Sequence, residues 1–480
     1  MGVNMGLFDK KSKENEVNEE VVAAKTPEEL KKEKGIKESS FVMGVEKILP
    51  GVDPGETVLY GKMDGAAVRD SMVYVCNPGS DNDKVRQVKV LGIFEANNLV
   101  MASAGGPVGI VVAAPLNTKF KVGDVVFTPD VTLESKVHSY VKALTNTYVV
   151  ERGLSLSREE VEALSTTDVE EIWRFYGWFT REIEKDPSEE KALEQQAKLT
   201  LVCNTLCGKI MRADYIYAVF CKYTGEPYMF SRTIANEDGS YMCTAPNIRI
   251  FTEAYKERME ELYGDEKYVI RKIENGEDKK GIYNFLGIAF YINGAAGVEI
   301  ISEDTVVTGS SLVAAPDYSN IPKNSVPVTN PDLVRWMLLL GQMGKIETDD
   351  QKTIYRIYYR FLAREIMKAK FLVPVHSTDT LPTANEEGRV TVSAGMSVGL
   401  PVLEGKDGKK ALRIFTDWRH LYEVFPDKSL NAAVETLDSL ISSFECVINL
   451  GRFPAAGRFV TLENFNEMEE LVRKEEEKQA

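Results

Sequence analysis

The stretch LRIFTDWRHLY (412–422) decides how the C-terminal part of this chain folds, and a relative of it, IRIFTEAYKER (248–258), lies earlier in the sequence. In both, an Ile-Phe pair typical of the end of a buried strand precedes a threonine and an acid. The threonine hydroxyl can cap a helix, and an acid suits the first helical turn. We therefore predict strand-to-helix corners, with Thr252 and Thr416 as caps and Glu253 and Asp417 in the first turns. A loop that contacts a peptide or an anion is the alternative.

The elements predicted around these two corners follow the same order. Each corner is preceded by two amphipathic helices and a strand, YIYAVF (215–220) or KFLVPV (370–375). Each is followed by a helix, which we place at 430–444 in the second case, and by an apolar run predicted as the closing strand, GIAFYI (287–292) or CVINLG (446–451). The pattern predicts a duplicated α+β unit at residues 155–325 and 329–470. Two unrelated α/β domains of similar rhythm are the alternative.

Asparagine and glycine follow the predicted closing strand in each unit. Asn293 precedes Gly294, and Asn449 stands two residues before Gly451. Both residue types tolerate left-handed backbone angles, so a turn accounts for them. A ligand contact is the alternative.

The N-terminal third of the chain has a different pattern. Residues 1–40 are charged and are predicted to be a disordered tail. Residues 471–480 are predicted to be a charged C-terminal tail, at the end of a frayed, charged helix. Residues 41–132 consist of short Val- and Ile-rich runs with turn residues between them. This spacing predicts a small all-β barrel or sandwich.

The glycine pattern of this β-rich segment resembles the second domain of elongation factor Tu and related translation factors. The resemblance rests on GETVLYGKMDGAAVRD (55–70), AGGPVGI (104–110) and VGDVV (122–126). It implies a barrel that contacts a neighbouring domain or RNA. No GTPase domain precedes the segment, so GTP hydrolysis is not expected.

Both α+β units resemble the SseB-like family of bacterial proteins. The second unit carries FLVP (371–374), LRIFTD (412–417) and VIN (447–449), and the first keeps IFTE (250–253) and IN (292–293). Neither has the complete Asn-Pro-Gly ending of the family. The resemblance implies a fold, and it transfers no catalytic residue.

Composition disfavours several classes of function. The 480 residues include 58 Lys and Arg against 73 Asp and Glu, a net charge of −15, and three histidines. This balance disfavours nucleic-acid partners and histidine-rich metal sites. No nucleotide-binding loop, signal peptide or membrane span is recognisable, and the six cysteines form no dense framework. We expect a cytoplasmic protein without a cofactor or a metal; Cys203 and Cys207 are read as core thiols, with metal binding as the alternative.

The functional hypothesis is a non-enzymatic scaffold or binding protein whose partners are proteins; whether it takes a small-molecule ligand is open. The candidate interaction loops hold Thr252, Glu253, Thr416, Asp417, Asn293 and Asn449. One alternative is a translation- or ribosome-associated accessory factor that uses the barrel. Another is a hydrolase, because GMSVG (395–399) matches the G-x-S-x-G pattern and Ser397 could act with Asp417 and His420.

Overall fold

The computed structural model describes residues 40–479, apart from 52, 81–83, 97, 114–118, 186, 237–239, 302–304, 323–324, 378–397, 405–409 and 427–430. The chain divides into two units, and the first comprises the described residues of Met1–Asn77 and Lys84–Ala143. The second comprises those of Pro78–Asp83 and Leu144–Ala480.

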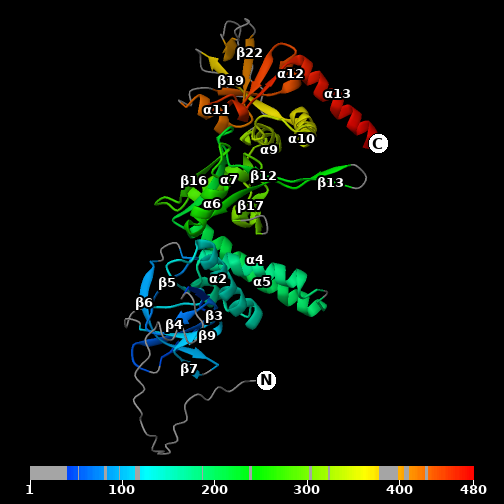
Figure 1. Cartoon of the computed structure of the whole chain (residues 1–480). Helices are drawn as coiled ribbons and strands as arrows, with labels where there is room; N and C mark the ends of the chain where they lie inside the picture. Colours follow the sequence, from blue (N-terminus) through cyan, green and yellow to red (C-terminus); the bar gives the residue numbers. More distant parts are fainter. Residues whose placement is uncertain are drawn as a thin grey trace, which may run out of the picture. The chain divides into compact units, whose positions relative to one another are not determined.

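The first unit contains a closed six-stranded β-barrel (Figure 1). Its strands are β1 (Phe41–Gly44), β3 (Glu56–Gly65), β5 (Met72–Cys76), β6 (Arg86–Glu95), β9 (Gly106–Ala113) and β10 (Val125–Phe127). They pair in the order β1-β10-β5-β6-β9-β3, and β3 pairs with β1 to close the barrel. The smaller strands are β2 (Lys47–Pro50) on β3, β7 (Asn98–Val100) on β6, and the pair β4 (Ala67–Val68) with β8 (Ala102–Ser103).

Apolar side chains at alternate positions of the strands fill this barrel. Val73 and Val75 of β5, and Val88 and Val90 of β6, point inward and are buried, whereas the residues between them are more exposed. Helix α2 (Leu133–Thr145) follows the barrel. It packs closely on β1 at Gly44, where an added Cβ would lie 2.1 Å from the carbonyl oxygen of Ser139.

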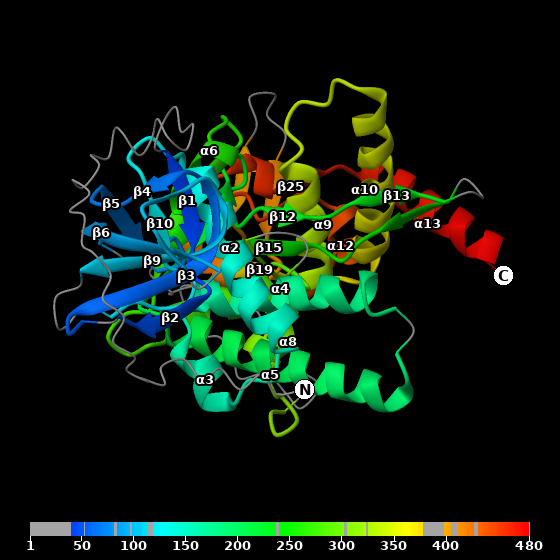
Figure 2. The same cartoon turned by 60° about the horizontal axis from the view of Figure 1, so that its bottom comes forward.

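The second unit begins with an α/β part that spans residues 158–312, the first α/β part. A π-helical turn, η1 (Asn146–Glu151), precedes it. Its helices are α3 (Arg158–Ala163), α4 (Thr166–Glu182), α5 (Glu189–Arg212), η2 (Glu253–Tyr255), α6 (Lys256–Leu262), α7 (Gly281–Tyr291) and α8 (Gly309–Leu312). Its strands are β11 (Tyr215–Cys221), β12 (Met229–Phe230), β13 (Thr233–Ala235), β14 (Tyr241–Cys243), β15 (Asn247–Phe251), β16 (Tyr268–Glu274), β17 (Gly297–Ile300) and β18 (Val306–Thr308). The main sheet has the order β16-β11-β15-β17-β18, with β12 on β15. Strands β13 and β14 form a separate ribbon that extends away from this sheet (Figures 1 and 2).

The second α/β part spans residues 331–479. Its helices are α9 (Pro331–Gly341), α10 (Asp349–Lys368), α11 (Trp418–Val424), α12 (Leu437–Ile441), η4 (Pro454–Ala456) and α13 (Leu462–Gln479). Its strands are β19 (Lys370–Ser377), β20 (Val398–Gly399), β21 (Val402–Glu404), β22 (Lys410–Ile414), β23 (Asn431–Thr436), β24 (Glu445–Ile448) and β25 (Arg458–Val460). They form the sheets β20-β19-β23 and β21-β22-β24-β25, which a bridge between Leu372 and Phe415 connects.

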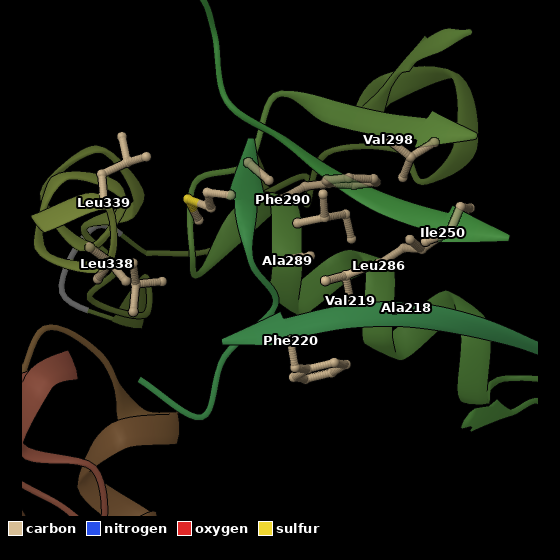
Figure 3. Packing of buried hydrophobic residues seen from close by; sticks show 14 of the residues in the cluster. Ala218, Val219, Phe220, Ile250, Leu286, Ala289, Phe290, Val298, Leu338 and Leu339 are labelled. Carbon is tan, nitrogen blue, oxygen red and sulfur yellow. The ribbon is translucent and has the colours of Figure 1, made fainter. Parts of the chain in front are cut away.

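One hydrophobic core runs through both α/β parts. In the first part, Leu286, Ala289 and Phe290 of α7 pack against sheet side chains that include Val219 and Ile250 (Figure 3). Helix α9 of the second part adds an almost wholly buried helix to the same core, with Leu338 and Leu339 among its members. The two parts therefore share buried apolar surface.

The prediction of a closing strand at GIAFYI (287–292) is wrong, because most of this run forms the end of α7. Ile282, Leu286, Ala289 and Phe290 are the buried residues of α7, a helical stripe that begins upstream of the run. The run itself is too uniformly apolar to show a period. The strand that follows α7 is β17.

The prediction of one helix over 430–444 is also wrong. Residues Asn431–Thr436 form β23, and only Leu437–Ile441 are helical; Leu430 lies outside the described residues. Strand β23 pairs with β19 over six residues, from Thr436 opposite Lys370 to Asn431 opposite Val375. Pairing with a distant strand outweighed the helical spacing of the apolar residues.

In the described part of the chain, none of the helices combines the length and apolar character that crossing a membrane requires.

Candidate functional site

A pocket of about 530 Å³ lies between the first α/β part and helices α9 and α10 of the second. Tyr228, Met229, Phe230, Arg249, Lys267, Tyr268 and Glu299 line it from the first part, and Leu339, Gln342, Met343, Ile354 and Tyr358 from the second, with further residues around the rim. We call it the junction pocket. Its volume falls in the range of small-molecule sites.

Gln342, directly after α9, fixes one wall of the junction pocket to the other. Its side-chain amide donates to the carbonyl of Met229 at 2.7 Å, and its side-chain oxygen accepts the Met229 N–H at 3.0 Å. The amide thus occupies the free edge of β12 as a neighbouring strand would. All these groups are buried, so the two hydrogen bonds hold α9 in register with β12.

We expect Gln342→Ala to lower the free energy of unfolding by about 2 kcal/mol, because it leaves the buried N–H and C=O of Met229 without partners. Urea unfolding curves of the two proteins measure the difference. Gln196→Ala is the control, since Gln196 is exposed and bonds only Thr200 on its own helix. Equal losses in both variants would contradict the assigned role.

Four aromatic rings form a cluster at the junction pocket. Tyr228 lies 4.8 Å from the ring centroids of both Phe230 and Tyr268, and Tyr263 lies 5.0 Å from Tyr268 and 6.0 Å from Phe230. All four pairs are edge-to-face, the arrangement that aromatic quadrupoles favour. Burial raises the pKa of Tyr228 and of Tyr268 to about 12, so both phenols are neutral at ordinary pH.

Arg249 of β15 joins this cluster and is largely neutralised. Its Nε and Nη2 donate to Oε2 of Glu299 at 3.1 and 2.5 Å, and its Nη1 donates to the Tyr263 hydroxyl. The guanidinium lies 4.2 Å from the centroid of the Phe230 ring. Glu299 is opposite Arg249 in the parallel β15–β17 ladder, so strand register brings the ion pair together.

Lys267, directly before β16, is the second cation of the cluster. Its Nζ donates to the Tyr228 hydroxyl at 2.9 Å and lies 4.7 and 5.4 Å from the ring centroids of Tyr228 and Tyr268. Within the described residues, no carboxylate lies within ion-pair distance of this ammonium group. Lys267 therefore brings a positive charge to the pocket that Glu299 does not balance.

The hydroxyl groups on the rim are engaged with backbone. Ser231 donates to the carbonyl of Thr244 at 2.8 Å, and the Thr244 hydroxyl accepts the Arg232 N–H at 2.8 Å. Among the described residues that line the pocket, none is a histidine or a cysteine. The pocket thus offers aromatic, charged and hydrogen-bonding groups of the kinds that recognition sites use.

The candidate residues of the second corner form one buried hydrogen-bond chain. The Thr416 N–H donates to Oδ1 of Asn449 at 3.0 Å, and Asn449 Nδ2 donates to the Thr416 hydroxyl at 2.7 Å. Thr416 in turn donates to Asp417 Oδ2 at 2.7 Å, which lies 2.6 Å from Nδ1 of His420. Asn330, before α9, donates to the carbonyl of Thr416 at 2.7 Å. These contacts fasten the strand-to-helix corner internally, and whether it also binds a partner stays a prediction.

Neither predicted hydroxyl cap forms, although Thr252 stands at the N-cap position of η2 with Glu253 in the first turn, as predicted. Asp417 itself is the N-cap of α11, because its Oδ1 accepts the His420 N–H at 3.0 Å. Thr252 makes no capping bond and instead lies 3.1 Å, hydroxyl to hydroxyl, from Thr167. Glu253 accepts hydrogen bonds from the hydroxyls of Tyr215 at 3.2 Å and Tyr217 at 2.6 Å. A carboxylate at the second corner takes the place that a hydroxyl was expected to fill.

Asn293 lies in a third buried network, which connects the two α/β parts. Its Nδ2 donates to Oε2 of Glu226 at 2.7 Å. Arg419 of α11 donates to Oε1 of Glu226 at 2.6 Å and contacts the Asn293 Oδ1 at 3.4 Å. Asn293 follows α7 rather than a strand, so its predicted equivalence to Asn449 is wrong.

The prediction of left-handed turns is confirmed at two of these positions, Gly294 with φ of 79° and Asn449 with φ of 50°. Ile301, directly after β17 in the first part, also has a left-handed backbone, with φ of 66°. Ile301 N–H donates to the carbonyl of Ile250 at 2.9 Å, as Asn449 N–H does to that of Ile414 at 3.0 Å.

Two further predictions concern cysteine and serine residues. Cys203 is half-buried and Cys207 is buried, both on α5, in or beside the shared core. In the described part of the chain, no group of three or more His, Cys, Asp or Glu is placed to hold a metal ion. Ser397 lies outside the described residues, although Asp417 and His420 are in contact as that hypothesis requires.

Sequence reasoning missed the residues that build the junction pocket. It also missed the buried pair of Arg419 and Glu226 outside the pocket, because these residues are 193 positions apart in the sequence and no local signal joins them. The paired aromatics Tyr228 and Phe230 alternate in the sequence as neighbours on one strand face do. Lys267 carried no signal, because it lies in an ordinary charged turn.

The second α/β part has an antiparallel pair of strands, a parallel pair connected through helices, and two helices ahead of them. Residues 357–450 match the family model of the SseB protein N-terminal domain. The match runs from the middle of α10 through β24 and includes Thr416, Asp417, His420 and Asn449. No curated protein matches the chain.

Proposed function

We propose that this chain is a non-enzymatic binding protein, built from a translation-factor-like barrel and two SseB-like α/β modules, and that it recognises protein partners. The observation that carries the proposal is the junction pocket, which combines aromatic rings, an unbalanced lysine and hydroxyls already bonded to backbone. Such a set of groups can hold a ligand, but it offers no activated nucleophile.

The order of elements supports tandem modules. In the first part, the elements β11, β15, α6, β16, α7, β17 and β18 come in this order, with β12–β14 and η2 inserted. In the second part, the elements β19, β22, α11, β23, α12, β24 and β25 come in the same order of types, with β20, β21 and η4 inserted. The parallel ladders agree as well, with Ile250 opposite Ile300 and Ile414 opposite Ile448. A left-handed residue follows each ladder. A duplicated gene segment would give these coincidences, and the family match of the second part extends by this argument to the first.

Site-specific photo-crosslinking tests the proposal. Val306 lines the junction pocket and is 42% exposed, so p-benzoylphenylalanine at this position can reach a bound partner. Val402, 39% exposed on β21 and not among the lining residues, is the matched control. We expect a discrete adduct in the native cell from position 306 and none from position 402, and loss of the adduct on Tyr268→Ala. Turnover of a substrate by the purified protein, abolished by Tyr268→Ala or Lys267→Met, would contradict the proposal.

A second candidate function is a ribosome-associated accessory factor, and the closed barrel is the observation that favours it. Barrels of this type in translation factors contact RNA or a neighbouring domain. Co-sedimentation with ribosomes that is lost on deletion of residues 41–130 would support this candidate. Absence from ribosomal fractions at low salt would exclude it, because any electrostatic contact is strongest there.

A further inference from the structure

We propose that the junction pocket binds an aromatic carboxylate, a ligand with one negative charge on a flat apolar body. This inference rests on the proposed function, because it takes the junction pocket as a recognition site, and it adds the chemical class of the ligand.

The charge of the pocket selects an anion. Arg249 and Lys267 face it from the first α/β part, and Glu299 is the single carboxylate among the described lining residues. This positive surface occurs in a chain with a net charge of −15. A positive potential at the pocket attracts anions, whereas the negative net charge of the chain repels them from the rest of the surface.

The arrangement of the two inner cations selects a single carboxylate rather than a phosphate. Arg249 has its Nε and Nη2 on Glu299, so the fork that would hold a phosphate bidentately is already occupied. Lys267 has one neutral partner, the Tyr228 hydroxyl, and retains two further N–H donors. One unbalanced ammonium group matches one negative charge.

The walls of the pocket select an aromatic body. Tyr228, Phe230, Tyr268 and Tyr358 present rings to it, and Leu339 and Ile354 add aliphatic surface. The Lys267 ammonium group lies over two of these rings. A carboxylate bound there therefore has ring faces and edges within reach of the group that carries it, and ring stacking adds to the charge contact.

Two sources could supply this chemistry, the C-terminal residue of a polypeptide or a free small molecule. Calorimetry with four probes distinguishes them: N-acetylphenylalanine, its amide, a ten-residue peptide ending in phenylalanine, and the same peptide with an amidated C-terminus. We expect both acids to bind and both amides to bind about 10-fold or more weakly, since a hydrogen-bonded charge is lost. A peptide acid that binds much more tightly than N-acetylphenylalanine identifies a polypeptide C-terminus, and equal affinities identify a free carboxylate.

Variants of the full chain test the role of Lys267. Lys267→Met should weaken binding of the acids about 10-fold and leave the amides within about 2-fold, whereas Lys267→Arg should retain most of the affinity. The matched control is Lys272→Met, because Lys272 also lies over a tyrosine ring, that of Tyr215 at 4.0 Å, but outside the pocket. Thermal unfolding of each variant checks that it is folded.

Three results would overturn the inference: no binding of either acid, equal binding of acids and amides, or phenyl phosphate binding more tightly than the acids. If the carboxylates fail to bind while the adduct at position 306 still forms, the ligand class is wrong and the proposed binding function stands. If both fail, the proposed function is wrong as well.

Discussion

Arg419→Met is expected to lower the free energy of unfolding by about 3 kcal/mol, because it leaves the buried Glu226 carboxylate without its ion-pair partner. The Glu226 side chain is 10% exposed, and its Oε1 accepts from Arg419 at 2.6 Å. Asn293 satisfies the other carboxylate oxygen but carries no charge. Burial alone lowers the pKa of Arg419. The charge and hydrogen bond of Glu226, together with the charges of Asp417 and of Glu423, which lies 3.0 Å from Arg419, outweigh burial and raise the pKa.

A double variant isolates the ion pair from the rest of the effect. Arg419→Met combined with Glu226→Gln removes both charges and keeps an amide that can bond Asn293. We expect it to recover most of the lost stability, since replacing a buried pair by neutral groups costs far less than breaking it. Arg360→Met is the surface control, because Arg360 is 59% exposed and lies 3.8 Å from Glu475, a pair worth about 0.5 kcal/mol or less. A double variant no more stable than Arg419→Met would contradict the assignment.

The same substitution has a consequence for the junction pocket. Glu226 precedes Tyr228 and Met229 by two and three residues, so the ion pair holds the segment that enters β12. A displaced segment moves the Tyr228 hydroxyl away from Lys267. We therefore expect Arg419→Met to weaken ligand or partner binding at the pocket as well, without contact between Arg419 and the ligand.

Prediction from sequence succeeded where an apolar period was long and local. The paired helices α4 with α5 and α9 with α10 follow from stripes such as Leu199, Cys203, Leu206 and Ile210. The β-rich segment follows from alternation between turn residues, and it closes into a barrel.

Prediction failed where distant pairing decided the outcome. The spacing of Val434, Leu437 and Ile441 fits a helix, and only the ladder with β19 makes a strand of residues 431–436. The junction pocket is harder still, because Arg249, Lys267 and Gln342 come from three separate segments. Their chemistry becomes visible only when β15, β16 and α9 are placed together. Among the candidate residues, Asn449 and Thr416 do meet, but no local signal indicates that Asp417 rather than Thr416 caps α11.

Asp417→Ala is expected to lower the free energy of unfolding by about 3 kcal/mol, since it removes the cap of α11 and the charged hydrogen bond to His420. Asp417→Asn keeps an oxygen for the capping bond and should cost less. The difference in free energy of unfolding between Asp417→Ala and Asp417→Asn therefore measures the contribution of the capping bond. The free energy lost in Asp417→Asn measures the contribution of the carboxylate charge. Guanidinium unfolding at pH 6 provides both values.

The ion pair of Asp417 and His420 also predicts how the free energy of unfolding depends on pH. Burial favours the neutral forms of Asp417 and His420. Their mutual hydrogen bond and charge attraction outweigh burial. The pKa of Asp417 is therefore lowered, and that of His420 is raised above its ordinary value of 6.5. Because the pKa of His420 is higher in the folded than in the unfolded protein, its contribution to stability is complete below the unfolded-state pKa. It disappears as pH rises through the folded-state pKa. A lowered aspartate pKa gives stability that is complete above the unfolded pKa and disappears as pH falls through the folded one. The pair therefore contributes most between about pH 4 and pH 6.5.

We expect His420→Gln to remove the loss of stability above pH 6.5. In the wild-type protein the free energy of unfolding should fall as pH rises from 6.5 toward 9, and in His420→Gln this fall should be absent. His138→Gln is the control, because His138 lies on α2 in the first unit and is not part of the Asp417–His420 pair. The wild-type profile also bears on the hydrolase hypothesis. A free energy of unfolding that rises from pH 6 to about pH 7.5 would mean that His420 is neutral when folded while the unfolded histidine still binds a proton. A neutral imidazole held by Asp417 is the state that a catalytic base requires. A falling profile instead identifies a structural ion pair that holds the corner between β22 and α11 closed.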